Sequence, residues 1–206
     1  MKTIGLTLLL LPLLCGQIAA IENWAPNPSA LTEGKMKTDR TIFLEATIHA
    51  PPSEVFRLWT SSEGVKKFFA PGARIDAQPG GRYQIIFFPS KDPEGDSHGT
   101  KGAHILKVVP NKVLAFEWIT FAGDNFLGNH APPYAPPAQR NVTPLPTWVE
   151  LSFEAVDGQP NQTHLKFAHY GFRDGELWAQ SFQWFTRAWK GVLDQLTTYC
   201  ENQQHI

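Results

Sequence analysis

Residues 50–72, APPSEVFRLWTSSEGVKKFFAPG, place several large apolar side chains between a proline pair and a terminal Pro-Gly. Pro51 and Pro52 cannot continue a strand, because proline lacks the N–H that a ladder needs, but their fixed φ suits the first turn of a helix. The segment therefore predicts an amphipathic helix that begins at the proline pair. Its apolar residues recur at helical spacing on one face: Val55, Leu58 and Trp59.

A second short helix is predicted directly after the first. Residues 60–63, TSSE, have the spacing of a capping box, in which Thr60 and Glu63 would satisfy the free N–H groups of a helix start. Pro71 and Gly72 would end this helix. Its expected apolar set is Val65, Phe68 and Phe69.

Alternating apolar and polar residues flank this helical segment. Residues 40–50, RTIFLEATIHA, alternate and predict a first, half-buried strand. After Gly72 the period of two continues over about a hundred residues, interrupted by short turns such as Pro79-Gly80-Gly81. Because short connections make consecutive strands antiparallel neighbours, we expect about seven strands in all.

The chain ends in a long amphipathic segment, residues 174–200, DGELWAQSFQWFTRAWKGVLDQLTTYC. Its apolar residues recur at steps of four and three over about six turns, which is the stripe of one continuous helix. Such an aromatic face must pack against an equally apolar surface, and we expect this surface to be the concave face of the sheet. The stripe consists of Trp178, Phe182, Phe185, Trp189, Val192 and Leu196.

The N-terminal region is predicted to lie outside the folded domain. Residues 1–20 carry a lone Lys2, an apolar run and small residues at the end, which is the pattern of a secretory signal peptide. The run is shorter than the roughly 20 residues that span a bilayer, so no membrane span is expected. Residues 21–37 are polar and predict a poorly ordered arm, and residues 38–206 suffice for one domain. The expected location is periplasmic or secreted.

Residues 123–146, GDNFLGNHAPPYAPPAQRNVTPLP, interrupt the strand pattern with a proline-rich insertion. The segment shows no periodicity and is longer than an ordinary hairpin loop. Two interpretations stay open: a lid over a binding site, and a tolerated surface insertion.

Composition and spacing argue against several partners and cofactors. The formal net charge is -1 and no Lys or Arg run occurs, so a nucleic-acid partner is not expected. The histidines form no His-x-His or His-x-x-x-His pair, so neither a metal nor another cofactor is expected. No Gly-x-Ser-x-Gly elbow is present, and Cys200 lies at the end of the last helix. The sequence thus shows no catalytic motif.

The order of these segments resembles the helix-grip fold of the START/SRPBCC superfamily, in the AHSA-type branch that includes the C-terminal domain of the Hsp-90 ATPase activator. The resemblance implies an α+β protein in which a curved antiparallel sheet of about seven strands grips a long C-terminal helix. Two short helices follow the first strand. The matching stretches span residues 41–198 and are IHAPPSEVFRLWTSSEGVKKFFAP, IDAQPGGRYQI, GAHILKVVPNKVLAFEW, PTWVELSFEAVDGQPNQTHLKFAHYGF and the terminal aromatic helix.

The resemblance also implies a cavity between helix and sheet that holds a small apolar molecule. Members of the superfamily include lipid and polyketide binders, cyclases, stress-response domains and chaperone cofactors, so the fold leaves the function open. The predicted export signal, and the absence of the separate N-terminal domain of the cytosolic activators, argue against a role on a cytosolic chaperone.

Strand alternation selects the residues that would face this cavity, because the charged residues are expected on the opposite face. The inward face carries His104, His169 and the phenol of Tyr83, which are the candidate acid or base groups. The alternative for each histidine is structural, with its ring satisfied by a backbone carbonyl or a buried water. Ligand contacts are predicted for Trp59, Phe69, Tyr83, Phe87, His104, Trp118, Phe167, His169, Trp178 and Phe182, whereas Trp189 and Leu196 are expected to be core.

Three functions follow as hypotheses. The first is an exported single-domain protein that binds a small hydrophobic molecule, lipid or polyketide-like, in the helix-sheet cavity. The second is an enzyme of cyclase, hydrolase or isomerase type with His169 or His104 as acid or base. The third is an interaction module with a protein partner. The first is preferred because no catalytic set is visible.

Overall fold

The computed structural model describes residues 40–96, 98–121 and 144–203. The predicted signal peptide, the predicted arm and most of the proline-rich insertion lie outside these residues. All described residues belong to one compact unit, Thr38–Ile206. Among the helices in this part of the chain, none has the length and hydropathy that crossing a bilayer requires.

The segment at residues 50–72 forms two short helices, as its proline pair and helical spacing predict. Helix α2 spans Pro52–Thr60 and helix α3 spans Ser62–Val65. The predicted second helix is therefore shorter than expected, because Phe68 and Phe69 lie in the turn that follows it. Both rings still pack against the core, as the buried face of α2 does.

The residue that caps α3 is Ser61, and the prediction of Thr60 is wrong. The N–H of Gly64 donates to Ser61 Oγ at 3.0 Å. Helix α2 continues through Thr60, whose hydroxyl donates to the Phe56 carbonyl at 2.8 Å, so this hydroxyl is already engaged. A cap must stand outside the preceding helix, and Ser61, with extended backbone, is the first residue that does.

Replacing Ser61 by alanine is expected to lower the free energy of unfolding by about 1 kcal/mol, because a free N–H at the start of α3 loses its acceptor. The midpoint of urea denaturation at unchanged slope measures this loss. Ser53→Ala, at an exposed position of α2, serves as the control and should change stability by less than about 0.5 kcal/mol. Equal effects of the two substitutions would contradict the role of Ser61 as a cap.

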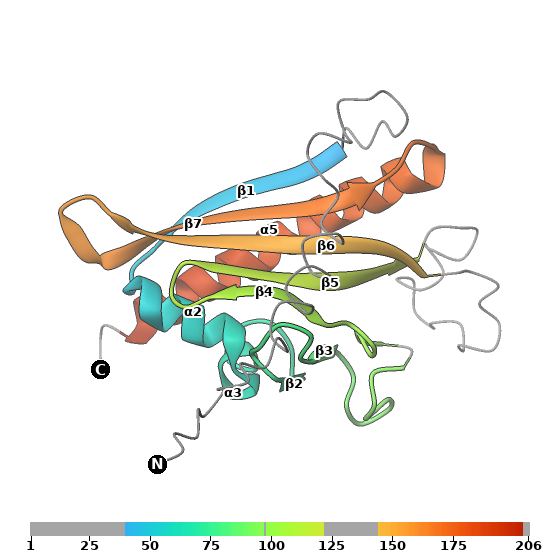
Figure 1. Cartoon of the computed structure of the whole chain (residues 1–206), viewed down its shortest axis with the longest axis horizontal. Coiled ribbons are helices and arrows are strands. Elements are labelled where there is room, and N and C mark those ends of the chain that lie inside the picture. Colours follow the sequence, from blue (N-terminus) through green and yellow to red (C-terminus); the bar gives the residue numbers. More distant parts are fainter. Residues whose placement is uncertain (1–39, 97, 122–143, 204–206) are drawn as a thin grey trace, which may run out of the picture. The chain divides into compact units, whose positions relative to one another are not determined.

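Seven strands lie in the described part of the chain (Figure 1). Five form one antiparallel sheet in the order β1-β7-β6-β5-β4, and β2 pairs with β3. Backbone hydrogen bonds join the two parts, since Tyr83 N–H donates to the Ala103 carbonyl at 2.9 Å. The predicted seven-stranded α+β fold is confirmed. The strands are β1 Arg40–Ile48, β2 Gly72–Ile75, β3 Tyr83–Ile86, β4 Ile105–Val109, β5 Val113–Phe121, β6 Pro144–Val156 and β7 Gln159–Phe172.

Strand β4 contains a register irregularity that changes which side chains at its start face the core. Its register on β5 changes between Ile105, which lies opposite Phe116, and Lys107, which lies opposite Ala115. An extra residue in a strand moves the side chains beyond it to the other face. Val108 therefore packs against the core as predicted, but at the start of the strand Ile105 is buried there in place of His104.

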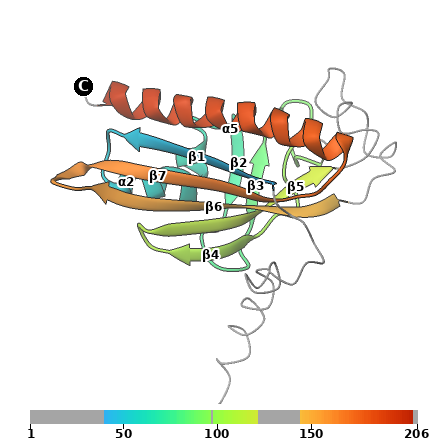
Figure 2. The same ribbon diagram turned by 90° about the horizontal axis from the view of Figure 1, so that it is seen from above.

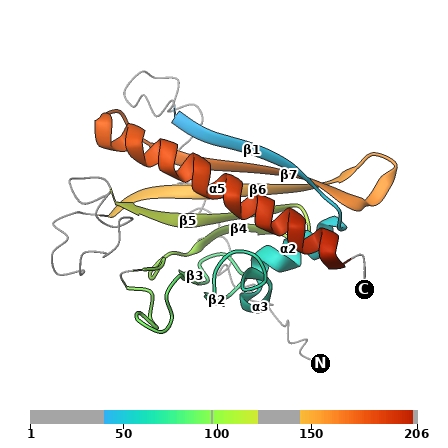
Figure 3. The same cartoon turned by 180° about the vertical axis from the view of Figure 1, so that it is seen from behind.

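The long helix α5, Glu176–Gln203, lies along one face of the sheet (Figures 2 and 3). Its C-terminal end lies near α2, so that the two short helices close one end of the interface between helix and sheet (Figure 3). Four residues of the predicted apolar stripe are buried, whereas Phe182 and Val192 are half-buried and Leu193 is buried next to Val192. The buried residues of α5 are Trp178, Ser181, Phe185, Trp189, Leu193, Leu196 and Cys200.

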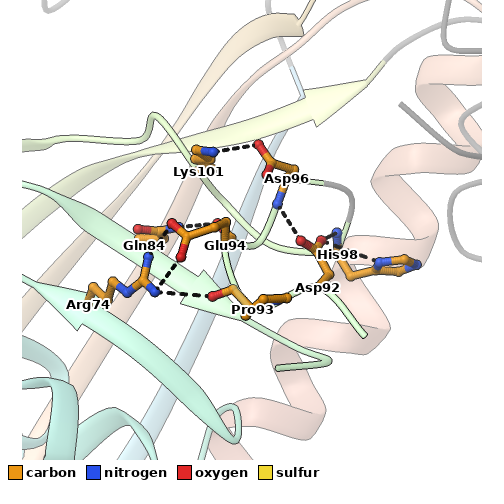
Figure 4. A network of polar contacts seen from close by, with 8 residues as sticks. All are labelled: Arg74, Gln84, Asp92, Pro93, Glu94, Asp96, His98 and Lys101. Atoms are coloured by element: carbon orange, nitrogen blue, oxygen red, sulfur yellow. Dashed lines mark hydrogen bonds and ion pairs between the residues drawn. The ribbon is translucent and has the colours of Figure 1, made fainter. Parts of the chain in front are cut away.

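A polar network holds the loop between β3 and β4 (Figure 4). Arg74 of β2 forms two hydrogen bonds with the carboxylate of Glu94, at 2.7 and 2.8 Å. The carboxylate of Asp92 accepts the backbone N–H groups of Asp96, at 3.0 Å, and of His98, at 2.7 Å. Because Asp92 is buried, these bonds define the loop conformation more strongly than the exposed ion pair does.

Candidate functional site

One of the two predicted inward histidines, His169 of β7, lies inside the interface between the sheet and α5. Its side chain is completely buried. The indole N–H of Trp189 donates to His169 Nδ1 at 2.9 Å, and Nε2 lies 2.9 Å from Thr147 Oγ1. The Thr147 hydroxyl donates in turn to the Trp118 carbonyl at 2.5 Å. Both ring nitrogens are therefore hydrogen-bonded within the core.

This chain of hydrogen bonds defines the protonation state of His169. Because Nδ1 accepts from an indole N–H, it carries no proton, and Nε2–H is the donor toward Thr147. Burial lowers the pKa of His169 to about 3. The ring is thus neutral near pH 7, and neither nitrogen is free to exchange a proton with a substrate.

The other histidine, His104, lies on the opposite face of the sheet, and the prediction that it faces inward is wrong. Its side chain is 54% exposed, and Nδ1 lies 3.0 Å from Glu117 Oε2. The same carboxylate oxygen accepts the backbone N–H of His104 at 2.8 Å. The irregular register of β4 is the physical reason, and it separates the two histidines that were candidates for one site.

Tyr83 points inward, as predicted. It is completely buried, its ring centroid lies 3.8 Å from that of Phe116, and its hydroxyl donates to the Trp59 carbonyl at 3.2 Å. Burial raises the pKa of Tyr83 well above its usual value. The phenol therefore stays protonated and engaged with the backbone, which is a packing role.

Most of the predicted contact residues touch one another. The ring centroid of Phe69 lies 5.5 Å from that of Trp189 and 6.0 Å from those of Trp118 and Phe87. Trp189 is also 4.6 Å from Trp118 and 4.8 Å from Phe167. These are distances of direct ring contacts. The middle of the helix-sheet interface is therefore an aromatic core built around Trp189.

The N-terminal half of α5 differs from this core. Trp178 and Phe182 contact Phe172 of β7 with ring centroids at 6.1 and 5.3 Å. Ser181 lies between them on the same helical face and is fully buried. Its hydroxyl has no hydrogen-bond partner among the described residues, although helical hydroxyls commonly donate to the carbonyl four residues earlier, as Thr186 does.

Another buried polar atom without a partner in the described part of the chain is Nε1 of Trp59. This side chain is fully buried, with its ring 5.8 Å from that of Phe69 and 5.0 Å from that of Phe68. Trp59 thus belongs to the aromatic core, and its indole N–H is an unused donor within it.

Sequence reasoning missed Ser181 and Thr147. Ser181 follows Trp178 by three residues and precedes Phe185 by four, so helical spacing alone places it on the apolar stripe. Thr147 precedes Val149 by two residues, so strand alternation places it on the inward face. A polar residue at an apolar position of a pattern was the signal available in both cases.

The described residues contain no group of three His, Cys, Asp or Glu side chains that could hold a metal ion. Cys200 is buried, and burial raises the pKa of its thiol to about 11. The thiol is therefore protonated near pH 7 and is a poor nucleophile.

A curved antiparallel sheet that grips one long helix around an aromatic core defines the class of this protein as a helix-grip α+β fold. Residues 49–201 match the family described as activator of Hsp90 ATPase homolog 1-like protein. The match covers more than half of the chain, so the chain belongs to this family, as the resemblance predicted. A comparison with curated proteins gives no match.

Solved structures share the fold. The protein MLL2253 from Mesorhizobium loti superposes with a TM-score of 0.57 at 20% identity, over 79% of this chain and 98% of that one. The Aha1 dimer from Colwellia psychrerythraea gives a TM-score of 0.53 at 20% identity, over 79% and 96%. NE0264 from Nitrosomonas europaea gives 0.54 at 14% identity, over 83% and 100%. At these identities the similarity establishes the fold alone.

Proposed function

We propose that the protein binds a small, mainly apolar molecule with one polar group, between the N-terminal half of α5 and the sheet, without catalysing a reaction. The buried hydroxyl of Ser181 carries this proposal, because it has no hydrogen-bond partner among the described residues. An unpaired buried polar group costs about 1–3 kcal/mol, and native proteins contain few of them. A ligand with one hydrogen-bonding group at Ser181 would remove this cost.

The surroundings of Ser181 suit an apolar ligand. Phe182 is half-buried, whereas Trp178 on one side and Phe185 on the other are buried. Aromatic walls with a single polar group are the usual form of a small-molecule site. Trp178 and Phe182 therefore remain the predicted contact residues in this proposal, while the rings around Trp189 serve as its rigid base.

The proposed ligand is a lipid or a polyketide-like molecule, the classes that the resemblance to the superfamily implies. In support, DynU16, a protein of the dynemicin biosynthetic locus, has the same fold, with a TM-score of 0.53 at 17% identity over 78% of this chain and 47% of its own. The leader predicted at residues 1–20 makes an exported location part of the proposal.

The environments of the two histidines favour a binding function over a catalytic one. His169 has both nitrogens engaged in the core, and His104 is paired with Glu117 on the outer face. A general acid or base must be free to exchange the proton that it transfers, and these contacts leave neither histidine free at the interface between α5 and the sheet.

The direct test is extraction of the protein purified from its native compartment, followed by mass spectrometry of the extract. We expect the extract to contain a lipid or polyketide-like molecule in stoichiometric amount. Repeated recovery of no such molecule would contradict the proposal.

Ser181→Ala is expected to have opposite effects on stability and on binding. Without ligand, the variant should gain about 1 kcal/mol in free energy of unfolding, because a buried unpaired hydroxyl is removed. The binding of cis-parinaric acid, a fluorescent lipid with one carboxyl group, should weaken about fivefold, which corresponds to one lost hydrogen bond. Urea denaturation and a fluorescence titration measure the two effects.

Thr186→Ala provides the matched control on the same helix. The Thr186 hydroxyl donates to the Phe182 carbonyl at 2.7 Å, so its removal leaves the proposed site unchanged. The affinity of this variant for cis-parinaric acid should stay within about twofold of the wild-type value, since 0.4 kcal/mol is about a factor of two. Equal binding by the wild type and Ser181→Ala would exclude Ser181 as the polar contact.

A further inference from the structure

The outer face of the sheet, opposite to α5, carries a groove that the proposed function does not use. The groove has a volume of about 610 Å³ and crosses strands β1, β7 and β6. The side chains that matter for its chemistry are Phe43, Glu45, Glu150, Lys166, Ala168 and Tyr170.

Ala168 forms the floor of the groove between two larger residues. Across the strands, Phe43 lies opposite Ala168, and Ala168 lies opposite Glu150. The small side chain of Ala168 therefore leaves space between Phe43 and Glu150. Residues opposite each other on one face of a sheet are direct neighbours, so Phe43 and Glu150 border the same space above Ala168.

Aromatic rings form the wall of the groove at this end. The ring of Phe43 stands perpendicular to that of Tyr170, at an interplanar angle of 86° and a centroid distance of 6.2 Å. Tyr170 is stacked on Trp148, with centroids 5.3 Å apart. Phe43 is 70% exposed, so this corner of two perpendicular rings is open to solvent.

The charge in the groove is negative and only partly compensated. Lys166 is paired at 2.8 Å with Glu154, which is not a lining residue, and Glu45 lies 3.6 Å from His164. Glu150 forms no ion pair within the described ranges. Burial is the main reason that the pKa of Tyr170 is raised, and the charge of Glu150 adds to this effect.

We infer that this groove binds an organic ammonium ion, with its methyl groups against Phe43 and Tyr170 and its charge beside Glu150. A cation is attracted to the faces of aromatic rings, and perpendicular rings with a carboxylate form the kind of cage that holds methylated ammonium groups. An anion would be repelled by Glu150. A neutral ligand would leave the Glu150 carboxylate without a partner.

The experiment compares choline with its neutral isostere, 3,3-dimethyl-1-butanol, in calorimetric titrations of the full chain at matched ionic strength. Choline should bind at least about ten times more tightly, since the isostere has the same shape without the charge. Glu150→Gln and Phe43→Leu should each weaken choline binding at least about threefold. Phe43→Leu keeps an apolar side chain at an exposed position, so it separates loss of the ring from loss of folding.

Asp157→Asn is the matched control. It removes one negative charge at the exposed turn between β6 and β7, outside the groove lining, so choline affinity should stay within about twofold of the wild type. Equal affinity for the two probes, or equal losses in Glu150→Gln and Asp157→Asn, overturns the inference. A dimer that depends on Phe43 and does not respond to choline would assign this face to a second copy of the chain, which also overturns it.

Discussion

Trp189→Ala is expected to lower the free energy of unfolding by about 3–5 kcal/mol, which is the usual cost of deleting a buried tryptophan side chain. The ring contacts Trp118, Phe167 and Phe69 and is almost completely buried. Its indole N–H is also the donor to His169 Nδ1, so the substitution leaves a buried acceptor unpaired in addition to a cavity. Domains of this size are stable by about 5–15 kcal/mol, and the variant should lose a large part of that margin.

Two comparisons separate these contributions in urea denaturation experiments. Trp189→Phe keeps most of the ring volume but removes the N–H, and it should cost about 1–3 kcal/mol, the penalty of one unpaired buried group plus a small void. Phe43→Ala removes an exposed ring and should change stability by about 0.5 kcal/mol or less. A loss for Trp189→Ala no larger than that for Phe43→Ala would show that α5 is not packed on this core.

The stability of the protein should fall by about 3 kcal/mol between pH 7 and pH 4 because of His169 alone. In the folded state burial lowers the pKa of this ring to about 3, whereas in the unfolded chain it is about 6.5. Between these values the unfolded state binds the extra proton, so acid favours unfolding. The contribution is fully present above pH 6.5 and is lost as the pH falls toward 3.

His169→Gln tests this prediction, because glutamine does not titrate but can still accept from Trp189 and donate to Thr147. The carboxylates of the protein also titrate in this range, so the relevant quantity is the difference between the two pH profiles of unfolding free energy. The wild-type profile should be steeper by about 3 kcal/mol over this interval. Parallel profiles would show that the pKa of His169 is the same in the folded and unfolded states. His169 would then again be a candidate general acid.

The contrast between His169 and His104 shows how much of the candidate site the sequence predicts. Strand alternation assigned both rings to the inward face, and it is correct for His169, where β7 keeps its register against β6 from residue 163 to residue 170. It fails for His104, because the register of β4 shifts between Ile105 and Lys107. An irregularity of one residue leaves no signal in an alternating sequence, although it turns a side chain to the other face.

The aromatic residues of the predicted site also show what residue periodicity can and cannot predict. Their positions on the inward faces of α5 and the strands follow from periodicity, and the structure confirms them for Trp118, Phe167 and Trp189. Periodicity does not tell whether two inward rings line a cavity or touch each other. That difference depends on the distance between elements, and the 4.6 Å between the Trp118 and Trp189 centroids makes them neighbours in a core.

Residue spacing along the chain is sufficient to predict the elements of this protein and its family. These elements are the two helices after the proline pair, the strands and the long aromatic helix. These features depend on the spacing of residues along the chain, which local backbone geometry converts directly into faces. Contacts in the folded protein establish that β1 pairs with β7, that His169 is neutral between Trp189 and Thr147, and that Ser181 has no hydrogen-bond partner among the described residues. These features depend on which side chains from distant segments meet in the core, and no spacing within one segment contains that information.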